Sequence, residues 1–168
     1  MEDKNPTIEF SDFVESAMRI LILLSKFEKK KSFKMTFDKI MLYDFYMKFP
    51  NIMIPEREDY STGYTFLDHY SFYHWKPDRD KYHGYLRYLV AKKLVDRNIK
   101  SNEFCYEINN NGSDSLEILR SAYAIKLGAI ADYIKINIIS NSDSKVENDI
   151  IEQSFKLRKL LSEEVTQQ

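Results

Sequence analysis

The sequence has little of what secreted and disulfide-stabilised proteins need. Among its 168 residues there is one cysteine, four glycines and four prolines. A single cysteine excludes an intramolecular disulfide, so a reducing compartment is the default expectation. The scarcity of glycine and proline favours a helix-dominated fold over a β-sandwich. We therefore expect a mainly helical protein.

Long hydrophobic runs and a net charge are also missing. The longest apolar run is Ile20–Leu24, and crossing a bilayer takes roughly 20 such residues. The start, Met1-Glu2-Asp3-Lys4, lacks the basic and apolar stretches of a signal peptide, so we expect a cytoplasmic protein without membrane contact. The net charge is −1, so binding to nucleic acid would require a local basic patch.

Motifs for catalysis or metal binding are absent from the sequence. The four glycines stand singly, and there is no HExxH motif, nucleophile elbow or acid pair at motif spacing. His69 and His74 have only Asp68 beside them, so a zinc site is not favoured. Cys105 has no cysteine–histidine motif around it and is better interpreted as an inert strand residue. The prediction is a protein that is not an enzyme and has no cofactor.

The residues that are present can build a core, since 43% are hydrophobic and 14% aromatic. Ile20–Leu24 is apolar on all sides and predicts a central helix, with Ser11 as its N-cap. Thr36 predicts the cap of a second apolar helix. Asp44 lies on the apolar arc of that helix. It could be a catalytic or metal-binding carboxylate, but we favour a buried acceptor for a lysine, an arginine or a capping amide.

The order of elements after residue 79 suggests a winged helix. A basic, tyrosine-rich helix at 80–93 is followed by a strand, a turn at 100–102, an alternating strand at 104–108 and a new capped helix. The predicted fold is mainly α with a small β-hairpin, built as a winged helix-turn-helix core plus long C-terminal helices. This fold is used both to read DNA and to hold protein partners.

Two domains are predicted, with a boundary after Gly112. Residues 1–112 would form the winged-helix domain, with an aromatic-rich insertion at 49–79, and residues 113–168 a long helix and a C-terminal helix that serve a partner or a dimer interface. The helix, capped by Ser113 or Asp114 and reaching Ile139, carries two apolar stripes. A helix resting on one core needs one stripe. The second stripe therefore predicts a partner contact, at Ile118, Ala122, Ile125, Ala129 and Tyr133.

Two further surfaces are candidates for contact. Residues 76–100 hold eight basic side chains and three acidic ones. They would touch DNA phosphates or an acidic partner, without the residues that read base edges; a solvated basic face is the alternative. The segment from 60 to 75 holds seven aromatic residues, typical of an ordered loop or a protein interface. The candidates are Lys81, Arg87, Tyr88, Lys92, Lys93 and Arg97 for the basic surface, and Tyr70, Tyr73 and Trp75 for the aromatic one.

Three segments carry a resemblance to a known family. They are 19–24 (RILILL), 41–46 (MLYDFY) and 85–95 (YLRYLVAKKLV). Across residues 10–125 the chain resembles the small middle component of bacterial ABC-three-component systems, a group similar to the small subunit of Lamassu-type anti-phage systems. The resemblance implies a winged-helix adaptor beside an SMC-like ABC ATPase and an effector such as a nuclease, in defence against phage or plasmid DNA. It brings no catalytic residues.

Two functions remain open from the sequence. The favoured one is a non-catalytic subunit of such a defence complex, which bridges the ATPase and the effector nuclease; contact with double-stranded DNA, without sequence preference, is a further expectation. The alternative is a winged-helix transcription regulator, which would bind a palindromic site as a dimer. A complex with the ATPase would favour the first, and a specific operator the second.

Overall fold

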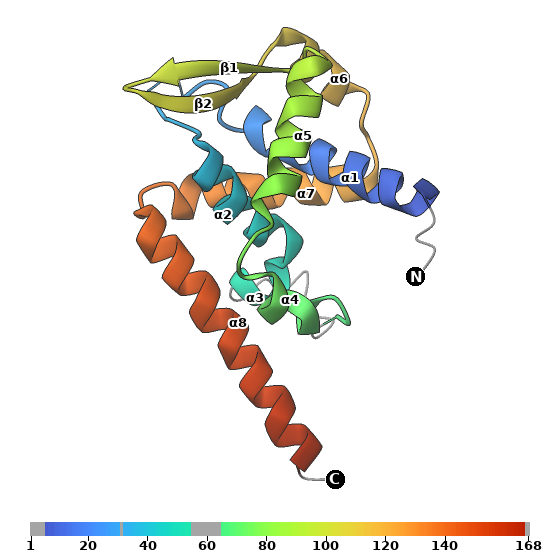
Figure 1. Cartoon of the computed structure of the whole chain (residues 1–168), viewed down its shortest axis with the longest axis vertical. Helices are drawn as coiled ribbons and strands as arrows, with labels where there is room; N and C mark the ends of the chain where they lie inside the picture. The colour runs from blue at the N-terminus through green and yellow to red at the C-terminus, as the bar shows by residue number, and fades with distance from the viewer. Residues whose placement is uncertain (1–5, 31, 55–64, 167–168) are drawn as a thin grey trace.

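The computed structural model describes the backbone of residues 6–30, 32–54 and 65–166 and the side chains of residues 11–30, 32–54 and 65–159. Over these residues the fold is mainly helical with one two-stranded antiparallel hairpin, as predicted (Figure 1). The elements are α1 (Pro6–Ser25), α2 (Phe37–Lys48), α3 (Pro50–Met53), η2 (Asp68–Tyr70), α4 (Ser71–His74), α5 (Arg79–Ala91), β1 (Val95–Lys100), β2 (Glu103–Ile108), α6 (Asn110–Glu117), α7 (Ala122–Tyr133), η3 (Ile134–Ile138) and α8 (Asp143–Thr166).

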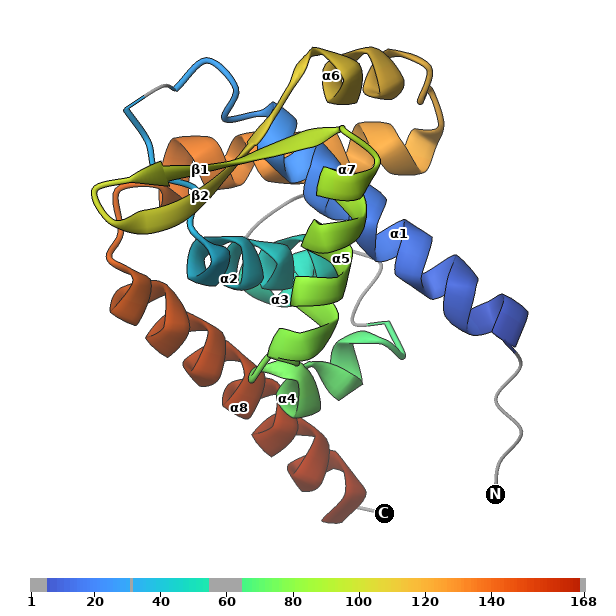
Figure 2. The ribbon, with the colours of Figure 1, turned by 45° about the horizontal axis from the view of Figure 1, so that its top comes forward.

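Helix α1 is the central element, as its apolar run predicts. The side chains of Ile20–Leu24 are all buried, and α1 packs against α2, α5, α6, α7 and β2. Figure 2 shows α5 crossing in front of α1, with α7 behind. Ser11 is not its N-cap, because the helix begins at Pro6 and runs through Ser11. Proline is well suited to the first turn of a helix, so the helix can start earlier than the serine.

Local sequence signals explain the other element boundaries. The Thr36 hydroxyl accepts a hydrogen bond from the Lys39 amide and starts α2, and the Asp78 carboxylate starts α5 by accepting from the amides of Asp80 and Lys81. Between the strands, Ser101 and Asn102 both have positive φ. Two such residues form the tight turn that matches the twist of a hairpin, and Lys100 pairs directly with Glu103.

The hairpin is tied to the segment that precedes α2. Cys105 is fully buried, as expected of a strand residue, and forms an isolated β-bridge with Thr36. The Tyr106 amide donates to the Met35 carbonyl. The residues between α1 and α2 therefore pair with β2, and this pairing holds the hairpin next to the start of α2.

The single long helix predicted from residue 113 to 139 is wrong. Two helices stand in its place, α6 and α7, and a turn at 118–121 separates them. The cause lies in two caps that the pattern of apolar residues hides: Asn109 accepts from the Gly112 amide and starts α6, and Ser121 accepts from the Ala124 amide and starts α7. After Tyr133 the helix widens into a π-helical turn, η3.

The C-terminal helix folds back onto the body. Helix α8 packs against α2, α3 and α4 and buries Val146, Ile150 and Leu157. One cluster of buried residues draws on α1, α2, α5, the hairpin, α7, η3 and α8, so the segments before and after the predicted boundary at residue 112 share a core. The boundary itself stays a prediction.

Candidate partner-binding surfaces

An apolar groove lies where α6 and α7 meet α1. It has a volume of about 430 Å³ and is lined by Leu116 and Leu119 on one side and Ile125 and Ala129 on another, with Ile22 on α1. Gly128 in its wall would bring an added Cβ no nearer than 3.6 Å to the Lys26 side chain, so the groove is not closed by tight packing there. We call this surface the α6–α7 groove.

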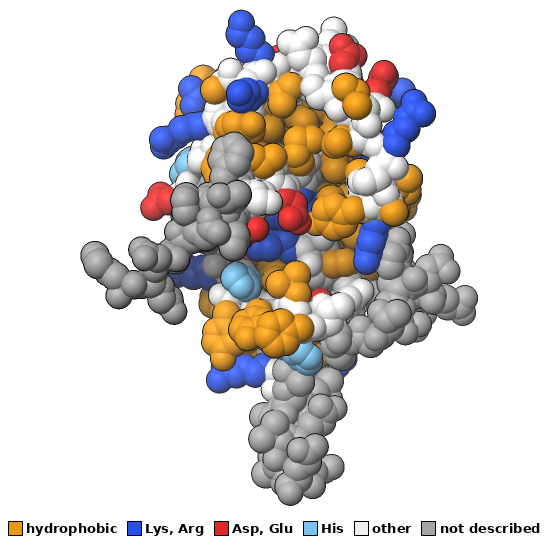
Figure 3. All heavy atoms as spheres, turned by 90° about the vertical axis from the view of Figure 1, so that its right-hand side faces the viewer, with side chains coloured by type: hydrophobic (Ala, Val, Ile, Leu, Met, Phe, Trp, Pro, Cys, Tyr) orange, Lys and Arg blue, Asp and Glu red, His pale blue; other side chains and the backbone are white. Residues whose placement is uncertain are grey.

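The second apolar stripe of the predicted long helix lies mainly on this outward side. Ile118 is 81% exposed, Ile125 66% and Ile136 74%. Ala122 is also exposed, whereas Ala129 and Tyr133 are half-buried. The first stripe turns inward only in its second half. Leu127, Ile130 and Ile134 are buried in the core, whereas Leu119 and Tyr123 of the same stripe are exposed. In Figure 3, hydrophobic side chains cover a broad area in the upper half of the face seen from the right of Figure 1.

Polar contacts frame the groove without filling it. The Lys26 ammonium donates to the Asp132 carboxylate at 2.8 Å, which neutralises the charged side chain at one edge. At the other end, the Tyr123 hydroxyl donates to Glu15 of α1 at 2.8 Å. The result is a mostly apolar concavity of the kind that holds the apolar face of a helix.

Aromatic side chains form a second exposed surface on η2 and α4. Phe66, Tyr70 and Tyr73 are exposed; the Phe66 ring packs edge-on against Tyr70, and the Tyr70 ring lies tilted against Tyr73. Of the predicted contact residues, Tyr70 and Tyr73 lie here, and Trp75 is half-buried against the core. Tyr60 and Tyr64 fall outside the described residues.

A buried carboxylate holds this aromatic turn in place. Asp68 is almost fully buried, and its Oδ2 accepts hydrogen bonds from the Thr65 amide at 2.6 Å, the Thr65 hydroxyl at 2.8 Å and the Asn51 side chain at 2.9 Å. An acceptor with three donors fixes the turn from Thr65 to Asp68 and ties it to Asn51 of α3. The exposed rings next to Asp68 are therefore presented by an ordered turn.

The predicted basic surface is only partly continuous. Arg87, Lys92, Lys93 and Arg97 are exposed on α5 and β1. Tyr88 is half-buried, because its ring packs edge-on against Phe13 of α1. Lys81 is exposed but lines a separate pocket. Acidic residues on the hairpin, Asp96, Glu103 and Glu107, dilute the positive charge next to Arg97.

Gly84, on the same helix, is half-buried and lies next to α1. An added Cβ would lie 3.5 Å from the Phe13 ring, an ordinary contact distance, so the packing does not exclude a side chain there. Val90 is 37% exposed. The rotation of α5 is set by Tyr82, Leu86 and Leu89, which are buried.

Asp44 is a buried acceptor, in agreement with the favoured interpretation. The Arg19 guanidinium binds it through two nitrogens, at 2.6 Å and 3.0 Å, and the Tyr82 hydroxyl donates to it at 2.6 Å. Burial alone would lower the pKa of Arg19, but the Asp44 carboxylate outweighs it, and the pKa lies above its ordinary value. Burial, followed by Asp44, raises the pKa of Tyr82. The triad joins α1, α2 and α5.

A second pocket, with a volume of about 320 Å³, opens beside this triad between α1, α2 and the segment from 73 to 85. Sequence reasoning did not find it. Arg19, Lys48, His74 and Lys81 line it together, and they come from three separate parts of the chain. The only signal available in the sequence was the basic character of 76–100, which carries Lys81 but neither Lys48 nor Arg19.

The described part of the chain has neither a membrane-spanning helix nor a cluster of metal ligands. No helix there is long and apolar enough to span a bilayer. No group of three or more histidine, cysteine, aspartate or glutamate side chains in the described residues could hold a metal ion. His69 and His74 are therefore not joined by further metal ligands within these residues.

Comparison with known proteins identifies the family to which the chain belongs. Residues 9–159 match the family model described as "ABC-three component (ABC-3C) system Middle Component 2". The chain belongs to this family and is therefore a component of an ABC-three-component system. No curated protein and no solved structure gives a significant match.

Proposed function

We propose that this chain is a non-catalytic accessory subunit that joins the ABC ATPase of its system to an effector of nuclease type. The observation that carries the proposal is the α6–α7 groove: Ile125 in its lining is 66% exposed and would gain from burial against another protein, as would Ile118 outside the lining, at 81%. In this proposal the ATPase is SMC-like and the complex defends against phage or plasmid DNA. The similarity to Lamassu small subunits belongs to the same proposal.

The groove is assigned to the ATPase, and the aromatic surface on η2 and α4 to the effector. The groove is long, apolar and bordered by two helices, which suits the apolar face of a partner helix. The aromatic surface is a compact group of rings, which suits an interface centre. Two surfaces on different elements support a bridging role better than a dimer interface, which needs only one.

A winged-helix core and DNA contact form a second part of the proposal. The order of α1, the Thr36–Cys105 bridge, α2, α5 and the hairpin supports a winged-helix arrangement. Arg87 and Lys92 on the outer side of α5 would then lie along DNA phosphates without reading bases. The runner-up function, a transcription regulator, rests on the same elements and predicts a specific operator.

Replacement of Ile125 by Asp tests the assignment of the groove. A charge in the buried centre of an interface loses the hydrophobic gain and leaves an ion unpaired, so co-purification with the ATPase component of the same system should fall at least about tenfold. Because Ile125 is exposed in the chain alone, the melting temperature of the isolated chain should stay close to that of the parent.

Ile99→Asp is the matched control, since Ile99 is similarly exposed, at 67%, but lies on the hairpin. It should leave co-purification unchanged. Equal losses in both variants, or none in Ile125→Asp, would remove the groove from the interface. Tight binding of one palindromic DNA site together with no ATPase complex would favour the regulator instead.

A further inference from the structure

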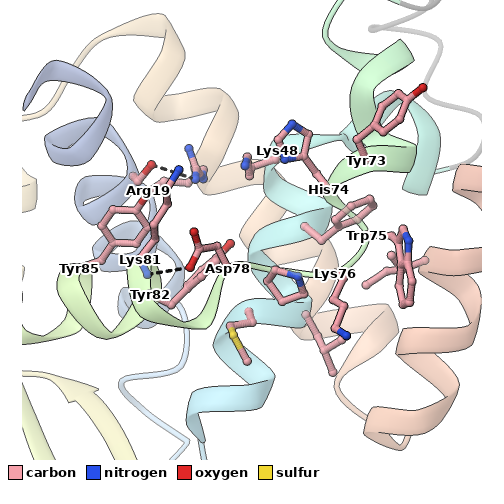
Figure 4. Close-up of a pocket in the computed structure, with 16 residues that line it drawn as sticks. Arg19, Lys48, Tyr73, His74, Trp75, Lys76, Asp78, Lys81, Tyr82 and Tyr85 are labelled. Carbon is pink, nitrogen blue, oxygen red and sulfur yellow. Dashed lines mark hydrogen bonds between the residues drawn. The ribbon is translucent and has the colours of Figure 1, made fainter. Parts of the chain in front are cut away.

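The pocket beside the Arg19–Asp44 pair gathers positive charge in one place. Figure 4 shows the side chains of Arg19, Lys48, His74 and Lys81 directed toward the same region, with Trp75 and Lys76 on the opposite side of the pocket. Like charges repel, so such a group is retained at a cost unless an anion offsets it. Packing of the core does not explain why these basic side chains lie together.

Of the cations in the pocket, Arg19 is paired with Asp44, but Lys48 and Lys81 are not paired within the described residues. Neither lysine forms an ion pair with an acid in that part of the chain. Asp44 is already bound by Arg19 and Tyr82. Asp78 is the one acid in the lining, and its carboxylate caps α5 by accepting from two backbone amides. The charge of Glu15 acts on Lys48 from outside the lining, without an ion pair between the two.

The pKa values of Lys48 and His74 are lowered, as expected for partly buried basic groups that lie close together. Burial lowers the pKa of Lys48; Asp44 acts in the opposite direction, and Arg19 and Lys81 lower the pKa further. Burial also lowers the pKa of His74, and the charges of Lys48 and Lys81 add to the effect. An anion placed among these groups would relieve each repulsion at once.

We propose that this pocket binds a small phosphate-bearing anion, with Lys48 and Lys81 as its main contacts. A phosphate ester carries about −1.5 to −2 charge and three strong acceptors, which suits a convergent set of cations better than a single carboxylate does. The volume of about 320 Å³ lies at the lower end of the roughly 300–1,000 Å³ typical of small-molecule sites.

The walls suggest the rest of the ligand. Tyr73, Trp75 and Tyr85 also line the pocket, and aromatic rings provide contact area for a nucleobase or another flat apolar group. The shape of the pocket also favours a small ligand over duplex DNA. A duplex presents its phosphates along an extended surface, whereas this pocket admits one phosphate-bearing group at a time.

Isothermal titration of the full chain tests the proposal with four probes: ATP, AMP, inorganic pyrophosphate and adenosine, at one ionic strength. We expect saturable binding of ATP and pyrophosphate and none of adenosine. Tighter binding of AMP or ATP than of pyrophosphate would identify a nucleotide as the ligand, and equal binding a free phosphate group. The absence of saturable binding for every phosphate probe would overturn the proposal.

Variants place the binding in this pocket. Lys48→Met and Lys81→Met should each weaken ATP binding at least about tenfold, because each removes a charge-assisted hydrogen bond. Lys29→Met, at an exposed lysine in the turn after α1, should change the affinity less than about twofold. Unchanged affinity in both pocket variants would contradict the assignment. Lys81 is exposed, so its variant keeps the test valid if Lys48→Met does not fold.

Duplex DNA serves as the last probe. If a short duplex bound and lost affinity in Lys48→Met and Lys81→Met while pyrophosphate and ATP did not bind, the pocket would be part of a nucleic-acid surface and the proposal would be wrong. The isolated chain is sufficient for all of these measurements, so their outcome is independent of the proposed complex with the ATPase.

Discussion

At the scale of single residues, Arg19 and Asp44 show how one buried ion pair connects three helices. Both side chains are buried, and Tyr82 completes the hydrogen bonds of the carboxylate. The sequence predicted a partner for Asp44 because a charge on an apolar arc needs one. It could not identify Arg19, which lies 25 positions away on another helix.

Asp44→Ala should destabilise the fold by about 3–5 kcal/mol, because it leaves the Arg19 charge buried without its anion. The double variant Arg19→Met/Asp44→Leu removes both charges and should lose less stability than the single one. Urea unfolding monitored by circular dichroism measures both. A double variant that is less stable than Asp44→Ala would contradict this account.

Buried tyrosines predict a loss of stability in alkaline solution. Burial, with a smaller contribution from Asp143, raises the pKa of Tyr43 to about 12, against about 10 in an unfolded chain. Between these two pH values the folded state binds more protons than the unfolded state. The free energy of unfolding should therefore fall as the pH rises through this window.

Tyr43→Phe isolates this effect, since the Tyr43 hydroxyl is buried and has no hydrogen-bond partner. The variant should be close to the parent in stability at pH 7. Its free energy of unfolding should fall less steeply with pH from about pH 10 to 12. Parallel pH profiles for the two proteins would show that Tyr43 does not contribute.

At the scale of elements, caps and one glycine determine where α6 lies. Gly112 sits in the first turn of α6, where an added Cβ would be 2.3 Å from the Leu94 carbonyl oxygen and 2.6 Å from Ile108. Leu94 directly precedes β1, and Ile108 is the last residue of β2. The close approach of α6 to the hairpin therefore depends on the missing side chain.

Gly112→Ala should lower the free energy of unfolding by more than about 1 kcal/mol, because backbone atoms must move to make room. Gly128→Ala is its control. Its added Cβ would meet only the flexible end of Lys26 at 3.6 Å, and alanine in a helix interior should gain about 0.5–1 kcal/mol. Thermal melts compare the two variants, and the same sign of change in both would refute this explanation.

The same elements show which features the sequence patterns could predict and which they could not. Apolar periodicity and the Thr36 cap predicted α2, the basic, tyrosine-rich run at 80–93 predicted α5, and the alternating run predicted β2. The break between α6 and α7 was missed because the residues on both sides keep helical spacing. The break is visible only from the capping hydrogen bond of Ser121. In the sequence, a serine that caps a helix looks the same as a serine on the surface.

At the scale of the whole molecule, three candidate contact surfaces lie on different elements. They are the α6–α7 groove, the aromatic turn on η2 and α4, and the basic side of α5. The sequence predicted the aromatic and basic areas by composition and the apolar one by helical periodicity. It could not predict the pocket beside the Arg19–Asp44 pair, because its lining comes from separate parts of the chain that meet only in the folded protein.

Hydrogen–deuterium exchange of the chain alone and with the ATPase component tests the central claim most directly, which is that the α6–α7 groove is covered by the ATPase. The account predicts slower exchange over residues 116–129 on complex formation, together with little change at the outer strand residues near Ile99. A complex that forms without protection of residues 116–129 would contradict it.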